Sequence, residues 1–235
     1  MKNKLILLML FVLIFFISCE NKNNNYVIKY NATEIKYSLP STFYITTTSD
    51  TSRNYRNHDN SVFISVSLNT PNVLADETMP FSTFLHEMAN KTSNPQYKDY
   101  LYIYNNLKKP TLLYNDFYSL GSEVKQIKKD NLLGETELSL SFDDNKYLYS
   151  PFILQSYFIS GNGIVSVDIY LFSENILSKM TEYGTYNKKA LLVNNNNVVN
   201  QIYNDYSKKL KHGPQELVDL FSLYNNVLNS LSIKN

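Results

Sequence analysis

The stretch "LHEMAN", Leu85 to Asn90, contains the residues of this chain that come nearest to a metal-binding motif. Histidine followed by glutamate on a helix begins the pattern H-E-x-x-H, in which two histidines one turn apart bind zinc and the glutamate acts as a base. The fourth position after His86 is Asn90 and not a second histidine. Because the site needs two ligands on one helical face, the sequence favours the polar outer face of an amphipathic helix here.

Other candidate catalytic groups lack the neighbours that their chemistry requires. Ser119–Glu123 ("SLGSE") departs from the G-x-S-x-G nucleophile turn, and Asp143–Asp144 fits a β-turn better than an acid pair. Gly161–Gly163 is not followed by the helix that a phosphate-binding loop needs, and His58 and His212 fall in predicted loops without a motif. We therefore expect no enzyme, no cofactor and no metal site, although dispersed residues could still assemble a catalytic site that no local motif reveals.

The one cysteine of the chain, Cys19, follows an uninterrupted apolar run, Leu5–Ile17, that two lysines, Lys2 and Lys4, precede. A helix of this length covers about 20 Å, well short of the ~30 Å hydrocarbon core of a bilayer. A positive start, a short apolar run and a small residue at the cleavage point are typical of a signal peptide. The sequence therefore predicts a signal peptide over residues 1–18.

The junction Phe16-Ile17-Ser18-Cys19 resembles the lipobox of bacterial lipoprotein signals, with Ser18 as the small residue before the cut. In such signals a lipid is attached to the cysteine sulfur, and each buried CH₂ of its chains contributes about 0.8 kcal/mol to membrane binding. The resemblance implies a protein of the bacterial cell envelope, lipid-anchored through Cys19 to the inner or outer membrane and either periplasmic or surface-exposed. The alternatives are an ordinary signal peptide with an incidental cysteine, or a short signal anchor.

The whole chain has 235 residues, of which 43% are hydrophobic, and a net charge of +1. The part that follows the signal peptide is large enough for one folded domain. So balanced a charge offers no electrostatic reason to expect a nucleic-acid partner or an acidic membrane surface. We expect residues 19–34 to hold the lipidated cysteine and a flexible tether. Residues 35–235 then form a single α+β domain, with a helical insertion around 176–211.

Alternating apolar residues predict strands in Ile35–Thr48, broken at Pro40, and in Ser61–Asn69, where Phe63 lies on the face opposite Val62, Ile64, Val66 and Leu68. The hairpin Pro151–Phe172 turns at Gly161–Gly163. Leu132–Gly134 is predicted as another turn, and Ser49–Asn60 and Asn194–Asn197 as loops.

Three helices are expected from apolar residues spaced at three and four positions. One follows Pro80, one carries Val199, Ile202, Tyr206 and Leu210 on a single face, and the last begins at Pro214. Strands, a helix, a long antiparallel meander and a closing helix together indicate an α+β fold, an antiparallel β-sheet with flanking helices.

Four stretches of this pattern resemble the Mog1/PsbP-like family of α/β sandwiches. They are "YSLPSTFYI", "MPFSTFLHEMANK", "SYFISGNGIVSVDIYLFSEN" and "LFSLYNNVLNSLSI". The resemblance spans most of Ile35 to Ile233 and implies a Mog1/PsbP-like sandwich that acts as a binding or assembly module, with no catalytic residue carried across.

Tyrosines are dense between residues 97 and 118, and Tyr102 and Tyr104 share one face of a predicted strand near Tyr100. Aromatic side chains with polar tips are common on recognition surfaces, so Tyr100, Tyr102 and Tyr104 form a candidate binding face. The alternative is a sheet face half-buried under helices. We expect a non-enzymatic protein-binding or assembly module with an unknown protein partner; a surface-exposed adhesin or antigen that uses the tyrosine-rich face is the alternative.

Overall fold

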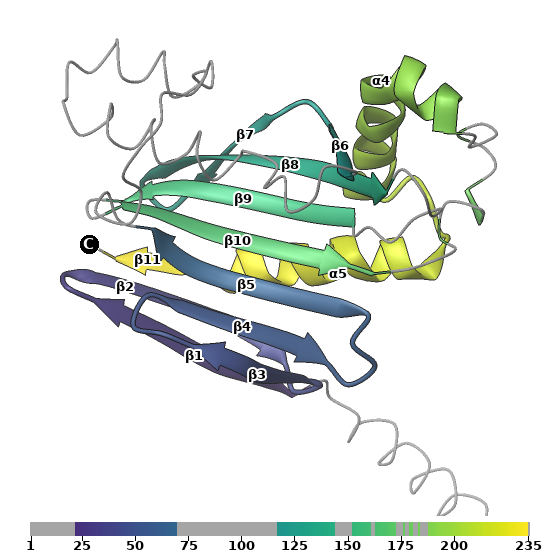
Figure 1. Cartoon of the computed structure of the whole chain (residues 1–235). Coiled ribbons are helices and arrows are strands. Elements are labelled where there is room, and N and C mark those ends of the chain that lie inside the picture. Colours follow the sequence, from purple (N-terminus) through teal and green to yellow (C-terminus); the bar gives the residue numbers. More distant parts are fainter. Residues whose placement is uncertain are drawn as a thin grey trace, which may run out of the picture.

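The computed structural model of the chain (Figure 1) describes residues 22–69, 117–143, 152–160, 163–172 and 188–234, together with Ile176, Lys179, Met180 and Tyr183. The predicted helix after Pro80 lies outside these residues. The predicted signal peptide, Cys19, Tyr100, Tyr102 and Tyr104 also fall outside the described part of the chain.

Most described strands belong to one large antiparallel sheet, in the order β3-β4-β5-β10-β9-β8-β6, with β7 paired to β8. Its strands are β3 (Phe43–Thr48), β4 (Ser52–Asn57), β5 (Val62–Asn69), β6 (Phe117–Gly121), β7 (Lys125–Lys129), β8 (Leu132–Asp143), β9 (Phe152–Ser160) and β10 (Gly163–Leu171). The neighbours β5 and β10 are far apart in the sequence, so their pairing, Val66 opposite Val167 for example, joins the two halves of the chain.

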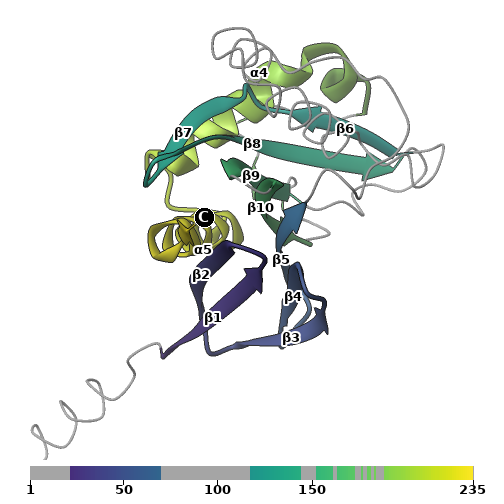
Figure 2. The ribbon, with the colours of Figure 1, turned by 90° about the vertical axis from the view of Figure 1, so that its left-hand side faces the viewer.

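A smaller antiparallel sheet contains β1 (Asn23–Tyr30), β2 (Thr33–Pro40) and β11 (Ser232–Lys234), in the order β1-β2-β11. Helix α5 (Gln215–Ser230) contacts both β2 and β10, and helix α4 (Lys188–Ser207) contacts β6 and β8. Figure 2 shows α5 end-on, with the small sheet below it and the large sheet beside it. The fold is therefore α+β, as the sequence predicts.

The core lies between α5 and one face of the large sheet, which we call the inner face. The alternation predicted for β5 is confirmed, because Ile64, Val66 and Leu68 are buried on this face. Strand β10 contributes Val165, Val167, Ile169 and Leu171, and α5 contributes Leu217, Leu220, Phe221, Tyr224 and Val227. The hairpin of β9 and β10 and the final helix after Pro214 are also confirmed.

The flexible tether predicted for residues 19–34 is wrong from Asn23 onward, because Asn23–Tyr30 is strand β1. Its asparagines favour loops locally, yet every residue from Asn23 to Tyr30 pairs with β2. The loop predicted for Ser49–Asn60 is wrong for the same kind of reason, since Ser52–Asn57 forms β4 between β3 and β5. In both segments tertiary pairing overrides a weak local preference.

Three further expectations differ from the structure. Asn194–Asn197 lies inside α4 rather than in a loop, because a low helix propensity is only a weak prior within a helix of 20 residues. Val199, Ile202 and Tyr206 are buried as predicted, but α4 ends at Ser207 and leaves Leu210 exposed.

The third difference concerns Gly134, which belongs to β8 and not to a turn. A Cβ there would overlap the carbonyl oxygen of Tyr157 and lie 2.8 Å from a ring carbon of Phe158. Glycine is thus required by the close approach of β9, and the chain turns earlier, at Asp130, where φ is +53°.

Candidate functional site

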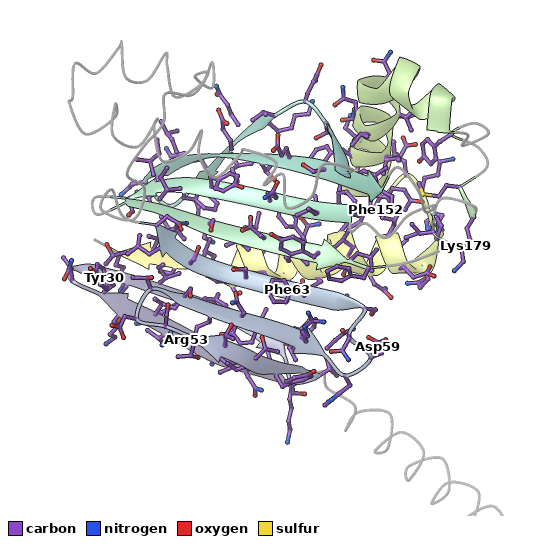
Figure 3. The ribbon with its side chains drawn as sticks, viewed as in Figure 1. Tyr30, Arg53, Asp59, Phe63, Phe152 and Lys179 are labelled. Atoms are coloured by element: carbon purple, nitrogen blue, oxygen red, sulfur yellow. The ribbon has the colours of Figure 1, made fainter. Side chains whose placement is uncertain are left out.

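A row of four aromatic side chains and one arginine crosses the outer face of the large sheet, which is the face away from α5. The row consists of Tyr44 on β3, Arg56 on β4, Phe63 on β5 and Tyr170 on β10, with Phe172 directly after β10. Strand register aligns the first four, because Tyr44 pairs with Arg56, Arg56 with Phe63 and Phe63 with Tyr170. We call these five residues the aromatic row. Figure 3 labels Phe63 near its middle.

Four side chains of the aromatic row, those of Arg56, Phe63, Tyr170 and Phe172, contact one another in order. The guanidinium carbon of Arg56 lies 5.6 Å from the centre of the Phe63 ring, within the range of a cation–π interaction. The rings of Phe63 and Tyr170 meet edge to face at 5.3 Å, and those of Tyr170 and Phe172 stack at 6.4 Å. These contacts hold the four side chains in one arrangement before any ligand binds.

The two ends of the aromatic row are open to solvent. Tyr44 is 42% exposed and Phe172 is 40% exposed, while Phe63 and Tyr170 are half-buried between them. His58 stacks on Tyr44 at 5.8 Å, and the Tyr44 hydroxyl donates a hydrogen bond to Asn60 Oδ1 at 3.1 Å. An aromatic surface with one arginine and exposed ends has the composition typical of the centre of a protein interface.

A polar row runs beside the aromatic row, offset from it by two residues on β5 and β10, and continues onto β9 and β8. It contains Ser65 on β5, Asp168 on β10, Gln155 on β9 and Glu137 on β8, each opposite the next in register. Gln155 Nε2 donates to Asp168 Oδ1 at 3.4 Å and to the Tyr157 hydroxyl at 2.9 Å. The outer face therefore changes within two residues from aromatic to polar and acidic.

Asp168 is the most strongly perturbed carboxyl group on this face. Burial raises its pKa to about 7, and the hydrogen bond from Gln155 acts in the opposite direction. Burial, together with the charge of Asp168, also raises the pKa of the neighbouring Tyr170. A carboxyl group that gains its proton near neutral pH gives this face a charge that depends on pH.

The acidic residues of the polar row do not form a metal site with other described residues. Within the part of the chain that the structure describes, no group of three or more His, Cys, Asp or Glu residues is arranged to hold a metal ion. Helices of the described residues are likewise too short or too polar to cross a membrane.

The residues singled out in the sequence are distributed as follows. Cys19, Tyr100, Tyr102 and Tyr104 lie outside the described residues, as does His86. Of the other two histidines, His58 is exposed beside Tyr44, and His212 is exposed in the segment between α4 and α5.

Sequence reasoning missed the aromatic row, although one signal for it was present. Phe63 and Tyr170 are large aromatic residues at the polar positions of strands whose other faces are apolar. Their assembly depends on the pairing of β5 with β10, which the local sequence does not specify.

A second aromatic cluster, on the inner side, has a structural role. Tyr26, Tyr37 and Tyr55 pack between the small and the large sheet, with the rings of Tyr26 and Tyr55 4.8 Å apart. The hydroxyls of Tyr37 and Tyr55 are hydrogen-bonded at 2.6 Å, and both rings are fully buried. Tyrosine abundance in this chain thus serves the core as well as the surface.

Comparison with known proteins gave matches among solved structures alone. No protein-family model matches the chain. No curated protein matches it either.

The crystal structure of the Ran-binding protein Mog1p of Saccharomyces cerevisiae superimposes with a TM-score of 0.47 and 11% identity, over 90% of this chain and 96% of that one. The solution structure of the cyanobacterial PsbP (CyanoP) of Synechocystis sp. PCC 6803 gives 0.41 and 10%, over 69% and 88%. These are the two kinds of protein after which the Mog1/PsbP-like family is named.

Proposed function

We propose that this chain is a lipid-anchored, non-enzymatic binding module of a bacterial cell envelope, and that it docks a partner protein on the aromatic row. The exposed aromatic row carries the proposal. Large rings that are already packed against one another lose little conformational entropy on binding, and residues such as Tyr and Arg dominate the energetics of protein interfaces. The anchor is Cys19, whose sequence context resembles a lipobox.

Site-specific photo-crosslinking in intact cells tests the binding surface. A photoreactive phenylalanine analogue replaces Phe172 in one variant and Leu133 in the other. Leu133 is a matched control, because it is 37% exposed but lies on β8, away from the aromatic row. We expect a discrete covalent adduct with another protein at position 172 and none at position 133. Equal adducts at both positions, or none at 172, would contradict the proposal.

Two substitutions then test which side chains of the aromatic row contribute to binding of the partner. Arg56→Ala and Tyr44→Ser remove the cation and one exposed ring, and each is expected to weaken binding of the crosslinked partner by about tenfold. Val27→Ser, which removes an exposed apolar side chain of β1, serves as control and should leave binding unchanged.

Lipid anchoring has its own test. Cells that express the chain with Cys19 or with Cys19→Ala are fed labelled palmitate and fractionated. We expect label and membrane association with cysteine only; label in the alanine variant would show that the lipid is attached elsewhere. Protease treatment of whole cells distinguishes the adhesin alternative, because a surface-exposed chain is digested and a periplasmic one survives.

A further inference from the structure

The segment that joins α4 to α5 presents an apolar side chain among lysines. Leu210 is 62% exposed, the largest exposed fraction of any large hydrophobic residue in the described part of the chain. Lys208, Lys209 and Lys211 surround it in the sequence. Lys208 and Lys209 are exposed, and neither forms an ion pair with a described residue. We call residues 208–211 the basic turn.

Backbone hydrogen bonds hold Leu210 in its exposed position. Its amide donates to Asp205 O at 2.8 Å, and the amide of Lys209 donates to Tyr206 O at 3.2 Å. Lys209 has φ of +56°, the left-handed conformation with which many helices end. Lys211 lies 5.8 Å from the centre of the Tyr183 ring. The turn is therefore a defined structure that points a leucine outward.

The basic turn lies at the end of the molecule where β1 begins. Figure 3 shows Asp59, in the β4–β5 turn, and Lys179 at one end of the molecule, and Tyr30, the last residue of β1, at the other. The ammonium group of Lys179 pairs with Glu216, so the first turn of α5 also lies at the end with Asp59. The start of β1 lies at the same end as Asp59. The amide of Ser41 donates a hydrogen bond to Lys22 O, and Phe43, two residues after Ser41, pairs with Asn57, two residues before Asp59.

This placement brings the basic turn to the side of the anchor. Lys22 is three residues after Cys19, and three extended residues span at most about 10 Å. A lipid on Cys19 therefore keeps this end of the domain close to the bilayer. Of the acidic groups at this end, Glu216 pairs with Lys179 and Asp205 accepts a hydrogen bond from Tyr183 at 2.7 Å, whereas Asp59 is exposed.

We infer that the basic turn rests on the bilayer, with Leu210 inserted at the level of the headgroups and the lysines on anionic lipids. The inference depends on the lipid anchor of the proposed function. Leucine supplies apolar area and each lysine near an anionic surface strengthens binding about fivefold. The contact fixes which end of the domain faces the membrane, and so how the aromatic row is presented to a partner.

Fluorescence quenching tests this orientation. The full-length lipoprotein is reconstituted into vesicles of phosphatidylcholine and phosphatidylglycerol, and Leu210→Cys or Leu133→Cys is labelled with an environment-sensitive fluorophore. Because Cys19 carries the lipid, the introduced cysteine is the only free thiol. We expect a blue shift and strong quenching by spin-labelled lipid at position 210, and neither at position 133. Leu133 lies at the opposite end of the domain, because Lys129, which pairs with its neighbour Leu132, donates to Asn229 O at the end of α5.

Charge variants and lipid composition separate this contact from other occupants. Lys208→Gln with Lys209→Gln should reduce quenching at position 210 severalfold, as should vesicles of phosphatidylcholine alone. The control pair Lys128→Gln and Lys234→Gln removes two exposed lysines elsewhere and should have no effect. Equal quenching at positions 210 and 133 overturns the inference. So does a blue shift at position 210 that grows with protein concentration in detergent, because that indicates a second copy on the turn.

The anchor and the turn fail in different ways. If the wild-type chain reacts with the thiol reagent and does not float with vesicles, the lipid anchor is wrong. If it floats and is unreactive but Leu210→Cys is not quenched, the anchor stands and the membrane contact of the turn is wrong.

Discussion

The hydroxyl groups of Tyr37 and Tyr55 lie 2.6 Å apart, although Tyr37 belongs to the small sheet and Tyr55 to the large one. Both side chains are fully buried, so the hydrogen bond joins the two sheets through the core. Burial raises the pKa of both phenols, that of Tyr55 to about 12.

The two hydroxyls should be energetically coupled, so that removing both costs less than the sum of removing each alone. Tyr55→Phe leaves the Tyr37 hydroxyl buried without its partner and is expected to lower the free energy of unfolding by about 1–2 kcal/mol. The double variant with Tyr37→Phe leaves neither group unpaired and should lose less than the sum of the single variants. Urea denaturation of the three variants measures this, and strictly additive losses would show that the two hydroxyls are not coupled.

Asp168 makes stability depend on pH in the neutral range. Its pKa rises from 3.8 to about 7 on folding, so between these values the folded chain keeps a proton that the unfolded chain has lost. The free energy of unfolding should therefore fall as pH rises from about 4 to 7 and level off above 7. The full shift corresponds to about 4 kcal/mol, and we expect about half of it because the side chain keeps some contact with solvent.

Asp168→Asn should abolish this slope and make the protein more stable than the wild type at pH 8. Denaturation curves at pH 4.5 and pH 8 measure both effects. Asp59→Asn is a suitable control, because hydrogen bonds from Ser61 lower the pKa of that exposed carboxyl, so its contribution lies below pH 4. An unchanged slope in the Asp168 variant would mean that another group is responsible.

Gly134→Ala should be strongly destabilising, by about 1–3 kcal/mol, because the new methyl group would overlap the backbone of Tyr157. Gly213→Ala offers a matched control, since nothing lies within 4 Å of a Cβ at that position. Thermal denaturation of the two variants compares them directly. Similar melting temperatures would indicate that β9 can move away from β8 at little cost.

Tyr224→Phe should lower the free energy of unfolding by about 1–2 kcal/mol. The Tyr224 hydroxyl is hydrogen-bonded to the hydroxyls of both Thr136 and Ser156, which are buried on the inner face of the sheet. Ser222→Ala, on the exposed side of the same helix, removes a hydroxyl from solvent and should cost nothing measurable. Equal urea midpoints for the two variants would contradict the role assigned to Tyr224.

Local sequence determined much of the framework. Alternation in β5 and β10 identifies their buried faces, and the spacing of Leu217, Leu220, Phe221 and Tyr224 identifies α5. These patterns succeed because each reports the burial of one face of one element, a local property of period two or three to four. They fail at β1 and β4, whose polar sequences are extended only because neighbouring strands pair with them.

Only the tertiary structure decided the surfaces. The aromatic row requires the pairing of β5 with β10, across some hundred residues of chain. The raised pKa of Asp168 depends on its burial, which only the folded chain provides. Leu210 has the spacing of a core residue, and it is exposed because α4 ends one turn too early to bury it. Sequence patterns specify which side of an element is apolar, but long-range pairing decides which side chains become neighbours.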